Sequence, residues 1–329
     1  MFFLFSREEG LYICMLKKFL KNCILGRMGL YSFLMLFFGI ALYVLSRIYF
    51  CVLQESFPPA ILTPLISLIV ITSFLFVTDI IVLRNLVITK EEIRVNPIAG
   101  KSVSVGMTAY NDEECIGRAV ADFVKEPVVS KVTVVDNNSS DSTGAEAAAA
   151  GAVVALEKKQ GYGYACMRAL EEASKSGDII VLVEGDETFS AGDLRKLLPY
   201  LENCDMVIGT RTTRELNSPD SQMDWLMVLG NILVAKLMQI RFWGIRFTDM
   251  GCTYRVMRKD AYEKIKSKLT VGKIHFLPHM LIQALKSELK VIEVPITFRK
   301  RAGKSKGVGN KKLTAIVVGI RMILLILFS

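Results

Sequence analysis

Short aliphatic runs alternate with longer amphipathic segments between residues 101 and 302. Helical spacing of apolar residues marks the segments 113–124, 144–150, 164–174 and 191–201. Buried parallel strands are typically near-continuous apolar runs joined by crossover helices, so the alternation predicts an α/β fold with a mostly parallel sheet. The predicted strands are Val103–Met107, Lys131–Asp136, Ala152–Leu156, Asp178–Glu184 and Asp205–Gly209.

Two longer apolar stretches precede this region. Gly29–Ser46 carries no charge, and Ala60–Leu83 is interrupted only by Asp79, with Pro58 and Pro59 between the two stretches. Each is about long enough to cross a bilayer, so residues 29–86 are predicted to form a transmembrane helical hairpin. A signal peptide is the weaker alternative, because charged residues interrupt the apolar positions of residues 1–26.

Composition and charge support an integral membrane protein. The chain is 52% hydrophobic, with a mean hydropathy of +0.39. Basic residues precede the first span and follow the second, which predicts that both ends, and the domain after the hairpin, face the cytoplasm at a plasma membrane or endoplasmic reticulum. Seven scattered cysteines without a CxxC pair fit reduced thiols in that compartment.

The net charge of +9 is concentrated near the end of the chain, in residues 299–312. Anionic lipid or phosphate substrates are favoured as partners, and no nucleic acid is expected, because an RNA-binding aromatic signature is absent from the sequence. Leu313–Phe328 is apolar but carries Arg321, which favours an interfacial or partly inserted helix and leaves a full span open. Trp225–Ala235 reads as an interfacial helix or a buried core helix.

Polar segments follow four of the predicted strands: TAYNDEE, DNNSSDS, KKQGYGYA and EGDETF. Ligands of open α/β sheets bind at the carboxyl ends of the strands. Glu184 and Asp186 repel each other and lose hydration after a buried strand, so a positive group is expected between them, and a divalent cation carrying phosphates is one candidate. Turns and helix caps are the plainer interpretation of each segment alone. GxGxxG is absent after the first strand, which argues against a nicotinamide enzyme.

The ordered set VSVGMTAYNDEE, VVDNNSSDST, QGYGYA, EGDETF, GTR, TDMGCTYR and EVPITFRKRAGKSK resembles family 2 glycosyltransferases of the GT-A fold. Within them it is similar to the polyprenyl-phosphate hexose synthases, which include dolichyl-phosphate mannose synthase. The resemblance covers about two thirds of the chain, roughly residues 102–306. It implies a Rossmann-like GT-A domain at 101–298. In chain order, a basic N-terminal segment (1–28) and the hairpin (29–86) precede this domain, and a basic juxtamembrane segment with an apolar helix (299–329) follows it.

The resemblance also assigns residues to the nucleotide sugar. Asn111 lies with Tyr110 and Asp112 in the segment that lines the nucleotide pocket, and Asp136 matches the first acid of the VDDGS motif. Asn137 stands where many members have a second acid that contacts the base. This difference leaves the identity of the base open. The other residues implied to bind the nucleotide sugar are Gly161, Gly163, Glu184 and Gly185.

Glu184, Gly185 and Asp186 fall on the DxD motif, whose acids hold Mg²⁺ or Mn²⁺ on the donor diphosphate. Glutamate is a departure from the motif, although its longer side chain suits direct or water-mediated coordination. Thr188 stands where the mannose synthases place a metal-binding glutamine. Two acids that only cap the next helix are the alternative.

Further matches lie near the diphosphate and the acceptor. Asp186, Asp249 and Arg211 are the implied catalytic residues, with Asp249 orienting the acceptor. Guanidinium groups suit phosphate oxygens, although surface ion pairs or a lipid-facing patch would also account for the basic residues. The residues implied to bind phosphate or acceptor are Arg211, Arg255, Arg301, Ser305 and Lys306.

The expected activity is therefore metal-dependent, inverting transfer of a hexose from a UDP- or GDP-sugar to a polyprenyl phosphate at the membrane. A processive polysaccharide synthase is the nearest alternative, but Gln222 is followed by MDW and not by the xxRW of its QxxRW motif. A non-catalytic nucleotide-sugar-binding membrane protein is the alternative from another class, favoured by Glu184 and Asn137. The sugar, the polyprenol and a homo-oligomeric state stay open.

Overall fold

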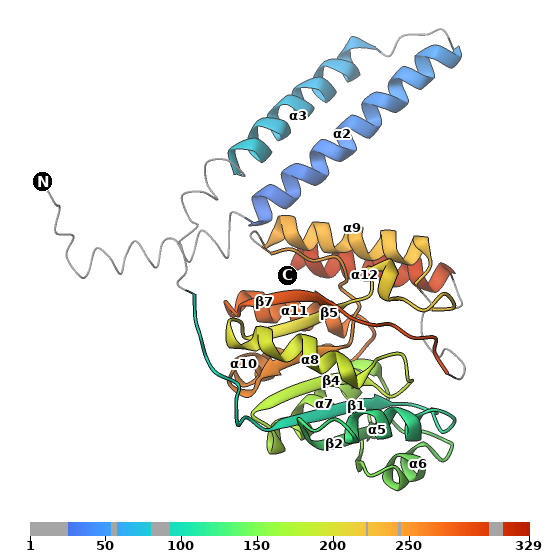
Figure 1. The fold of residues 1–329 in the computed structure, drawn as a ribbon. Helices are drawn as coiled ribbons and strands as arrows, with labels where there is room; N and C mark the ends of the chain where they lie inside the picture. Colours follow the sequence, from blue (N-terminus) through green and yellow to red (C-terminus); the bar gives the residue numbers. More distant parts are fainter. Residues whose placement is uncertain (1–25, 54–57, 80–92, 222, 243–244, 303–311) are drawn as a thin grey trace, which may run out of the picture. The chain divides into compact units, whose positions relative to one another are not determined.

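The computed structural model describes residues 26–53, 58–79, 93–221, 223–242, 245–302 and 312–329 (Figure 1). Residues 1–25 of the predicted basic segment and residues 80–86 of the predicted hairpin lie outside the described residues. Ser305 and Lys306 lie outside them as well. The chain divides into two compact units, one of residues 1–92 and 237–244 and the other of residues 93–236 and 245–329.

The smaller unit contains two long apolar helices, α2 (Gly26–Leu53) and α3 (Pro59–Thr78). The helices lie against each other, and the rings of Phe33 and Phe76 are 5.6 Å apart. Proline at the first position of α3 suits a helix start, because its fixed φ is helical and its missing N–H is not needed there. Both helices are long and apolar enough to cross a membrane. The helical pair expected from the sequence is therefore present.

The larger unit is built on a seven-stranded sheet with the order β3-β2-β1-β4-β6-β5-β7. Strands β1 to β4 run parallel, β6 runs antiparallel to both of its neighbours, and β7 is parallel to β5. The mostly parallel sheet expected from the sequence is confirmed, and β6 and β7 are additions to it. The strands are β1 (Val103–Ala109), β2 (Val129–Asp136), β3 (Val153–Leu156), β4 (Ile179–Glu184), β5 (Met206–Thr210), β6 (Arg255–Arg258) and β7 (Val291–Pro295).

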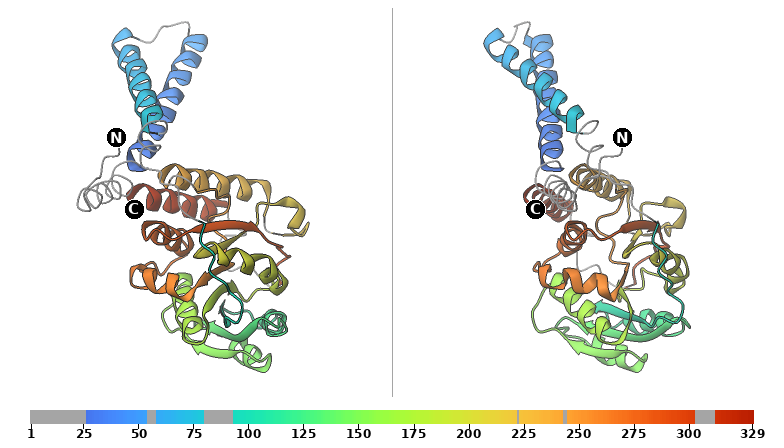
Figure 2. Two further views of the ribbon diagram at one scale, coloured as in Figure 1. Left: turned by 60° about the vertical axis from the view of Figure 1, so that its left-hand side comes forward. Right: turned by 90° about the vertical axis from the view of Figure 1, so that its left-hand side faces the viewer.

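Helices cover both faces of this sheet (Figure 2). Helix α7 packs along β1, β2 and β4, with α10 and α11 beside it, while α5 and α8 contribute to the core on the opposite face. Short 3-10 turns lie at Ala191–Asp193, Leu198–Glu202, Arg214–Leu216 and Lys266–Lys268. The α-helices of this unit are α5 (Ile116–Val124), α6 (Thr143–Ala149), α7 (Tyr162–Ser176), α8 (Leu194–Leu197), α10 (Lys259–Ile265), α11 (Phe276–Lys286) and α12 (Lys312–Phe328); α9 (Trp225–Arg241) belongs to it up to residue 236.

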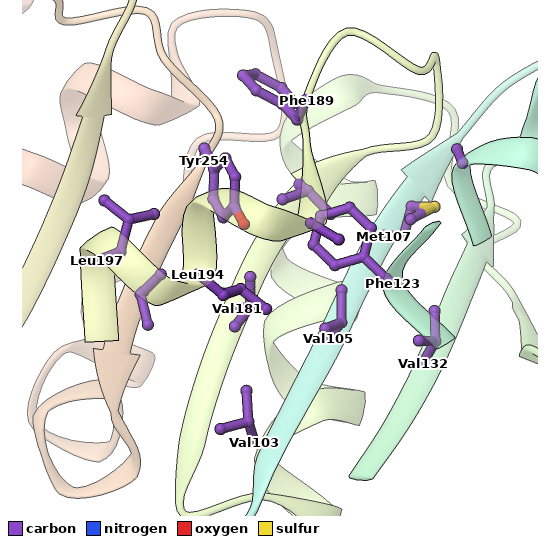
Figure 3. Packing of buried hydrophobic residues seen from close by; sticks show 14 of the residues in the cluster. Val103, Val105, Met107, Phe123, Val132, Val181, Phe189, Leu194, Leu197 and Tyr254 are labelled. Carbon is purple, nitrogen blue, oxygen red and sulfur yellow. The ribbon is translucent and has the colours of Figure 1, made fainter. Parts of the chain in front are cut away.

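The hydrophobic core beneath α5 and α8 follows from the two-residue period of the strands. Val103, Val105 and Met107 of β1 point to the same face and belong to one cluster with Phe123 of α5 (Figure 3). The ring of Tyr254 makes edge contacts with Phe123 at 6.1 Å and with Phe189 at 5.5 Å. Burying each such aromatic side chain contributes about 1.5–3 kcal/mol, so the core fixes the segment that follows β4.

Candidate active site

The carboxyl ends of β1, β2 and β4 bring the predicted polar segments together. β1 lies between the other two strands, with Ala109 opposite Asp136 and Thr108 opposite Glu184. The loops after these strands therefore share one edge of the sheet. Asp112, Asp136, Glu184 and Asp186 all belong to this edge, as the sequence predicts.

Asp186 is the most deeply buried acid of the edge, with 3% of its surface exposed. Its Oδ1 accepts hydrogen bonds from the backbone N–H and the hydroxyl of Thr188. Glu187 between them adopts φ of +65°, which turns the chain back toward the acid. Burial, together with the negative charge of Glu184, raises the pKa of Asp186 to about 6, although Arg301 and Thr188 act in the opposite direction.

A guanidinium group compensates the acidic edge in this structure. Nη1 of Arg301 lies 2.9 Å from Oδ2 of Asp186, and Nη2 lies 3.4 Å from Oδ1 of Asp112. Only 15% of the arginine side chain is exposed. Among the described residues its buried Nε has no hydrogen-bond partner. In this structure the positive group among these acids is therefore a side chain of the protein itself, that of Arg301.

Arg301 reaches the acids because the segment after β7, residues 296–302, passes along the end of β4. We call this segment the strap. Its backbone joins the site where Arg299 N–H donates to the carbonyl of Thr188 at 2.8 Å, and Phe298 forms a β-bridge with Phe189. The strap is thus held by main-chain bonds next to the acid that its arginine pairs with.

Glu184 is held by two hydroxyl groups. Its Oε1 accepts hydrogen bonds from Tyr162 Oη at 2.9 Å and from Thr253 Oγ1. The two hydroxyl oxygens are themselves 2.6 Å apart. Tyr162 begins α7 and Thr253 lies just before β6, so three separate parts of the chain meet at this carboxylate. Sequence reasoning did not single out either hydroxyl, and only their place in QGYGYA and TDMGCTYR could have suggested them.

Hydrogen bonds join the loop after β1 to the loop after β2. Asn111 adopts φ of +51°, and its Oδ1 accepts the backbone N–H of Ser140 at 2.7 Å. Asp112 accepts the N–H of Tyr110 at 3.0 Å, and Asp136 accepts that of Ser139 at 3.0 Å. These acids therefore order the pocket loops themselves. Tyr110 is 39% exposed beside them.

Asn137 bonds the loop after β3. Its amide nitrogen donates to the carbonyls of Glu157 at 3.0 Å and Lys159 at 2.9 Å, and its Oδ1 accepts the N–H of Gly161 at 2.9 Å. A carboxylate could not make the two donations. The amide thus has a structural reason to stand here, and its predicted contact with a base stays a prediction.

The glycines of QGYGYA allow a close approach between two parts of the backbone. A Cβ on Gly163 would lie 2.1 Å from the carbonyl oxygen of Val271, and one on Gly161 would lie 2.4 Å from that of Gly272. The N–H of Gly163 donates to the carbonyl of Gly272 at 3.1 Å. These glycines therefore fix the start of α7, beside their predicted role at the ligand. A Cβ on Gly185 would lie 2.3 Å from Cδ1 of Ile116, the end of a flexible side chain, so a larger residue there would displace Ile116.

Arg211 and Asp249 form a bidentate ion pair with each other. Nε and Nη2 of the arginine lie 2.7 Å and 2.9 Å from the two carboxylate oxygens, and the acid is fully buried. Burial alone would raise the pKa of Asp249, but Arg211 holds it below its ordinary value. Burial would lower the pKa of Arg211, but Asp249 raises it overall. Both groups therefore stay charged. The side chain of Arg211 is 16% exposed and held in place by the buried acid, so its guanidinium can present a fixed positive charge.

Glu293 of β7 supports this pair and was missed from the sequence. Its carboxylate accepts the backbone N–H groups of Thr248, at 2.8 and 2.9 Å, and of Asp249, at 2.8 Å. It also accepts the hydroxyl of Thr248 at 2.8 Å. An acid inside an otherwise aliphatic strand was the available signal, in the segment EVPITF.

Arg255 lies beneath the site. Its guanidinium donates to the carbonyls of Leu277 at 2.8 Å, Cys252 at 3.2 Å and Met250 at 3.4 Å, and only 1% of the residue is exposed. Burial lowers its pKa to about 10. In this structure Arg255 ties the loop before β6 to α11, and its predicted phosphate contact stays a prediction.

The described residues offer two carboxylates to a cation. They contain no group of three His, Cys, Asp or Glu side chains placed to hold a metal ion. Mg²⁺ is commonly held by one or two carboxylates together with substrate phosphates and water, so Glu184 and Asp186 fit such an ion on a diphosphate. The guanidinium found against Asp186 also shows that a positive group is accommodated there.

Comparison with known proteins places this geometry in a family. Residues 104–266 match the family model described as Glycosyl transferase family 2. This stretch contains β1 from its second residue, β2 to β6 and the acids of the edge, and it ends before Arg301 and the strap.

Three relatives and one solved structure are informative. The low-salt glycan biosynthesis hexosyltransferase Agl6 of Haloferax volcanii is 31% identical over 62% of this chain, which spans about half (49%) of that relative's length. The dolichyl-phosphate hexose transferase of the same organism is 28% identical over 62% of this chain and 86% of its own. The undecaprenyl-phosphate mannosyltransferase of Micrococcus luteus is 27% identical over 64% and 86%.

Glucosyl-3-phosphoglycerate synthase from Mycobacterium tuberculosis, solved with Mn²⁺, UDP-glucose and phosphoglyceric acid, has a TM-score of 0.53 at 17% identity over 70% of this chain and 81% of its own. At that identity the likeness concerns the fold, which agrees with the GT-A-like sheet expected from the sequence.

Proposed function

Because this chain belongs to glycosyl transferase family 2, we propose that it transfers a hexose from a nucleotide sugar to a polyprenyl phosphate at a membrane surface. The observation that carries the proposal is the buried acid Asp186 at the edge of the sheet, paired with Arg301 and next to Glu184. Two relatives, each matched over 86% of its own length, are named dolichyl-phosphate hexose transferase and undecaprenyl-phosphate mannosyltransferase. The kind of acceptor is thus inferred from these names and from the basic strap.

Glu184 and Asp186 would hold Mg²⁺ or Mn²⁺, which would neutralise the diphosphate of the donor as it departs. The chain itself supplies position and charge. Arg211 is preorganised by Asp249 and stays protonated, so its fixed guanidinium would stabilise negative charge on phosphate oxygens without reorganising. The locked loops that carry Tyr110, Asp112 and Asp136 would hold the nucleoside.

The chemical step needs no strong general base. A polyprenyl phosphate is already an anion at neutral pH, and its oxygen would attack the anomeric carbon of the sugar. A new carbon–oxygen bond forms to the lipid phosphate while the bond to the nucleotide diphosphate breaks. Arg301 would exchange its acid partners for phosphate oxygens when donor and acceptor bind, since a guanidinium binds either anion. Attack from the opposite side of the ring would invert the anomeric centre.

Exposed apolar faces support a membrane location. α2 and α3 would form a transmembrane hairpin, with the larger unit on the cytoplasmic side. On α9, Trp225, Leu229 and Leu233 share one face and are 76%, 44% and 57% exposed. On α12 the exposed residues Val317, Ile320, Leu324 and Phe328 also recur at helical spacing. Faces of this kind suit a helix lying in the lipid interface, where the acceptor phosphate is found.

The test is incubation of membranes containing the protein with labelled UDP- and GDP-hexoses and polyprenyl phosphate, followed by extraction of lipid-linked sugar. Asp186→Asn keeps the shape of the side chain and should abolish product. Asp220→Asn, at an exposed ion pair with Lys300, should not reduce it. Product from the Asp186 variant at the wild-type rate, or product unaffected by EDTA, would contradict the proposal. Release of free sugar without lipid product would favour nucleotide-sugar hydrolysis or binding alone.

A further inference from the structure

The contacts of Glu184 distinguish its two carboxylate oxygens. Oε1 accepts from Tyr162 Oη at 2.9 Å and from Thr253 Oγ1. Within the described residues Oε2 accepts no hydrogen bond. One oxygen is therefore anchored to the protein and the other is left to bind elsewhere.

Tyr162 is well placed to act as an anchor. It is the first residue of α7, between two glycines whose N–H groups bond to Asn137 Oδ1 at 2.9 Å and to the carbonyl of Gly272 at 3.1 Å. Its backbone is thus fixed from both sides. A phenolic hydroxyl is protonated at neutral pH, so it can donate to the carboxylate 2.9 Å away.

Glutamate has one more rotatable bond than aspartate, so a glutamate ligand is less well oriented unless another group restrains it. Two hydroxyl groups from α7 and from the loop before β6 provide that restraint here. Hydrogen bonds to a metal ligand set its orientation, and their removal typically lowers metal affinity by about 10–100-fold.

We propose that Tyr162, together with Thr253, is a positioning residue that orients Glu184 so that its Oε2 serves the cation on the donor diphosphate. The inference rests on the proposed function and adds residues outside the acidic motif itself. It also gives a reason for a glutamate at this place, since the hydroxyl pair is matched to the longer side chain. Tyr162 acts through Glu184 and does not touch the cation.

The direct test measures Mn²⁺ affinity of the purified full-length protein in detergent, by the electron paramagnetic resonance signal of free Mn²⁺, with and without UDP. Tyr162→Phe removes only the hydroxyl and should weaken Mn²⁺ binding about tenfold. Tyr164→Phe is the matched control. It lies two residues further along α7, with its ring against Gly272, and should bind Mn²⁺ like the wild type. Thr253→Val should weaken binding, and Thr253→Ser, which restores a hydroxyl, should recover it.

A double-mutant cycle separates positioning from a general structural role. In a Glu184→Asp background the shorter carboxylate no longer meets the hydroxyl pair, so Tyr162→Phe should change Mn²⁺ affinity by less than about twofold. The same tenfold loss in both backgrounds, or wild-type affinity in Tyr162→Phe, would overturn the inference and leave the proposed function standing. A wild-type protein that binds no Mn²⁺ and yields no lipid-linked sugar would overturn both.

Discussion

Arg301 and a divalent cation would compete for the same carboxylate, and this leads to an unusual expectation. Removing a positive residue from an active site ordinarily weakens the binding of anions and has little reason to improve metal binding. Here the guanidinium lies 2.9 Å from Asp186 and must leave before a cation takes its place. Arg301→Ala should therefore bind Mn²⁺ more tightly than the wild type in the absence of nucleotide.

The size of the effect follows from charge, distance and burial. Two unit charges about 4 Å apart attract by roughly 4 kcal/mol at an effective dielectric constant of 20. Only 15% of Arg301 and 4% of Asp186 are exposed at the side chain, so solvent screens the pair weakly, but desolvation of both groups offsets part of the attraction. A net gain of about 1.4 kcal/mol, or tenfold in Mn²⁺ affinity, lies well within that limit.

The assay is a Mn²⁺ titration of purified protein without nucleotide at pH 8, above the pKa of about 6 that Asp186 has in the wild type. Arg299→Ala is the control, because Arg299 belongs to the same strap but pairs with Asp122 and Ser190 outside the acid pair. Its Mn²⁺ affinity should match the wild type. Formation of lipid-linked product should fall in Arg301→Ala even as Mn²⁺ binds more tightly. Unchanged or weaker Mn²⁺ binding in Arg301→Ala would refute the competition.

Two further outcomes are expected. Asp249→Asn leaves the buried Arg211 without its charge partner and should lower the free energy of unfolding by about 3–5 kcal/mol in denaturant titrations, whereas Asp220→Asn should scarcely change it. Because burial raises the pKa of Asp186 to about 6, Mn²⁺ affinity should fall about tenfold per pH unit below 6; affinity that is flat from pH 8 to pH 5 would contradict this. The same shift stabilises the metal-free fold below about pH 4, and that contribution is lost as pH rises through 6.

The strands that the sequence predicts correctly are those with uninterrupted aliphatic runs. β1 and β4 are buried on both faces, so their composition shows their position directly. β6 reads RVMR and has only four residues, and its pairing antiparallel between β4 and β5 leaves no periodic pattern. Local pattern cannot reveal such a strand, because its neighbours in the sheet determine it.

The candidate site was predictable as a set of segments and less so in its contacts. Acids after β4 can be read from the sequence, but the partner that neutralises Asp186 lies more than a hundred residues away and depends on where the strap runs. The amide at Asn137 reads as a departure from a family motif, whereas the structure gives it two carbonyls to donate to. Such hydrogen bonds depend on loop paths that no short motif specifies.

The ion pair between Arg301 and Asp112 joins residues separated by 189 positions. During synthesis the acidic loops leave the ribosome long before the arginine that balances them has been translated. A growing chain would therefore carry its two acids without their internal counter-charge, and cations in the cell would be free to bind them first. The pairs of Arg301 with Asp112 and Asp186 can therefore form only after most of the larger unit has been synthesised.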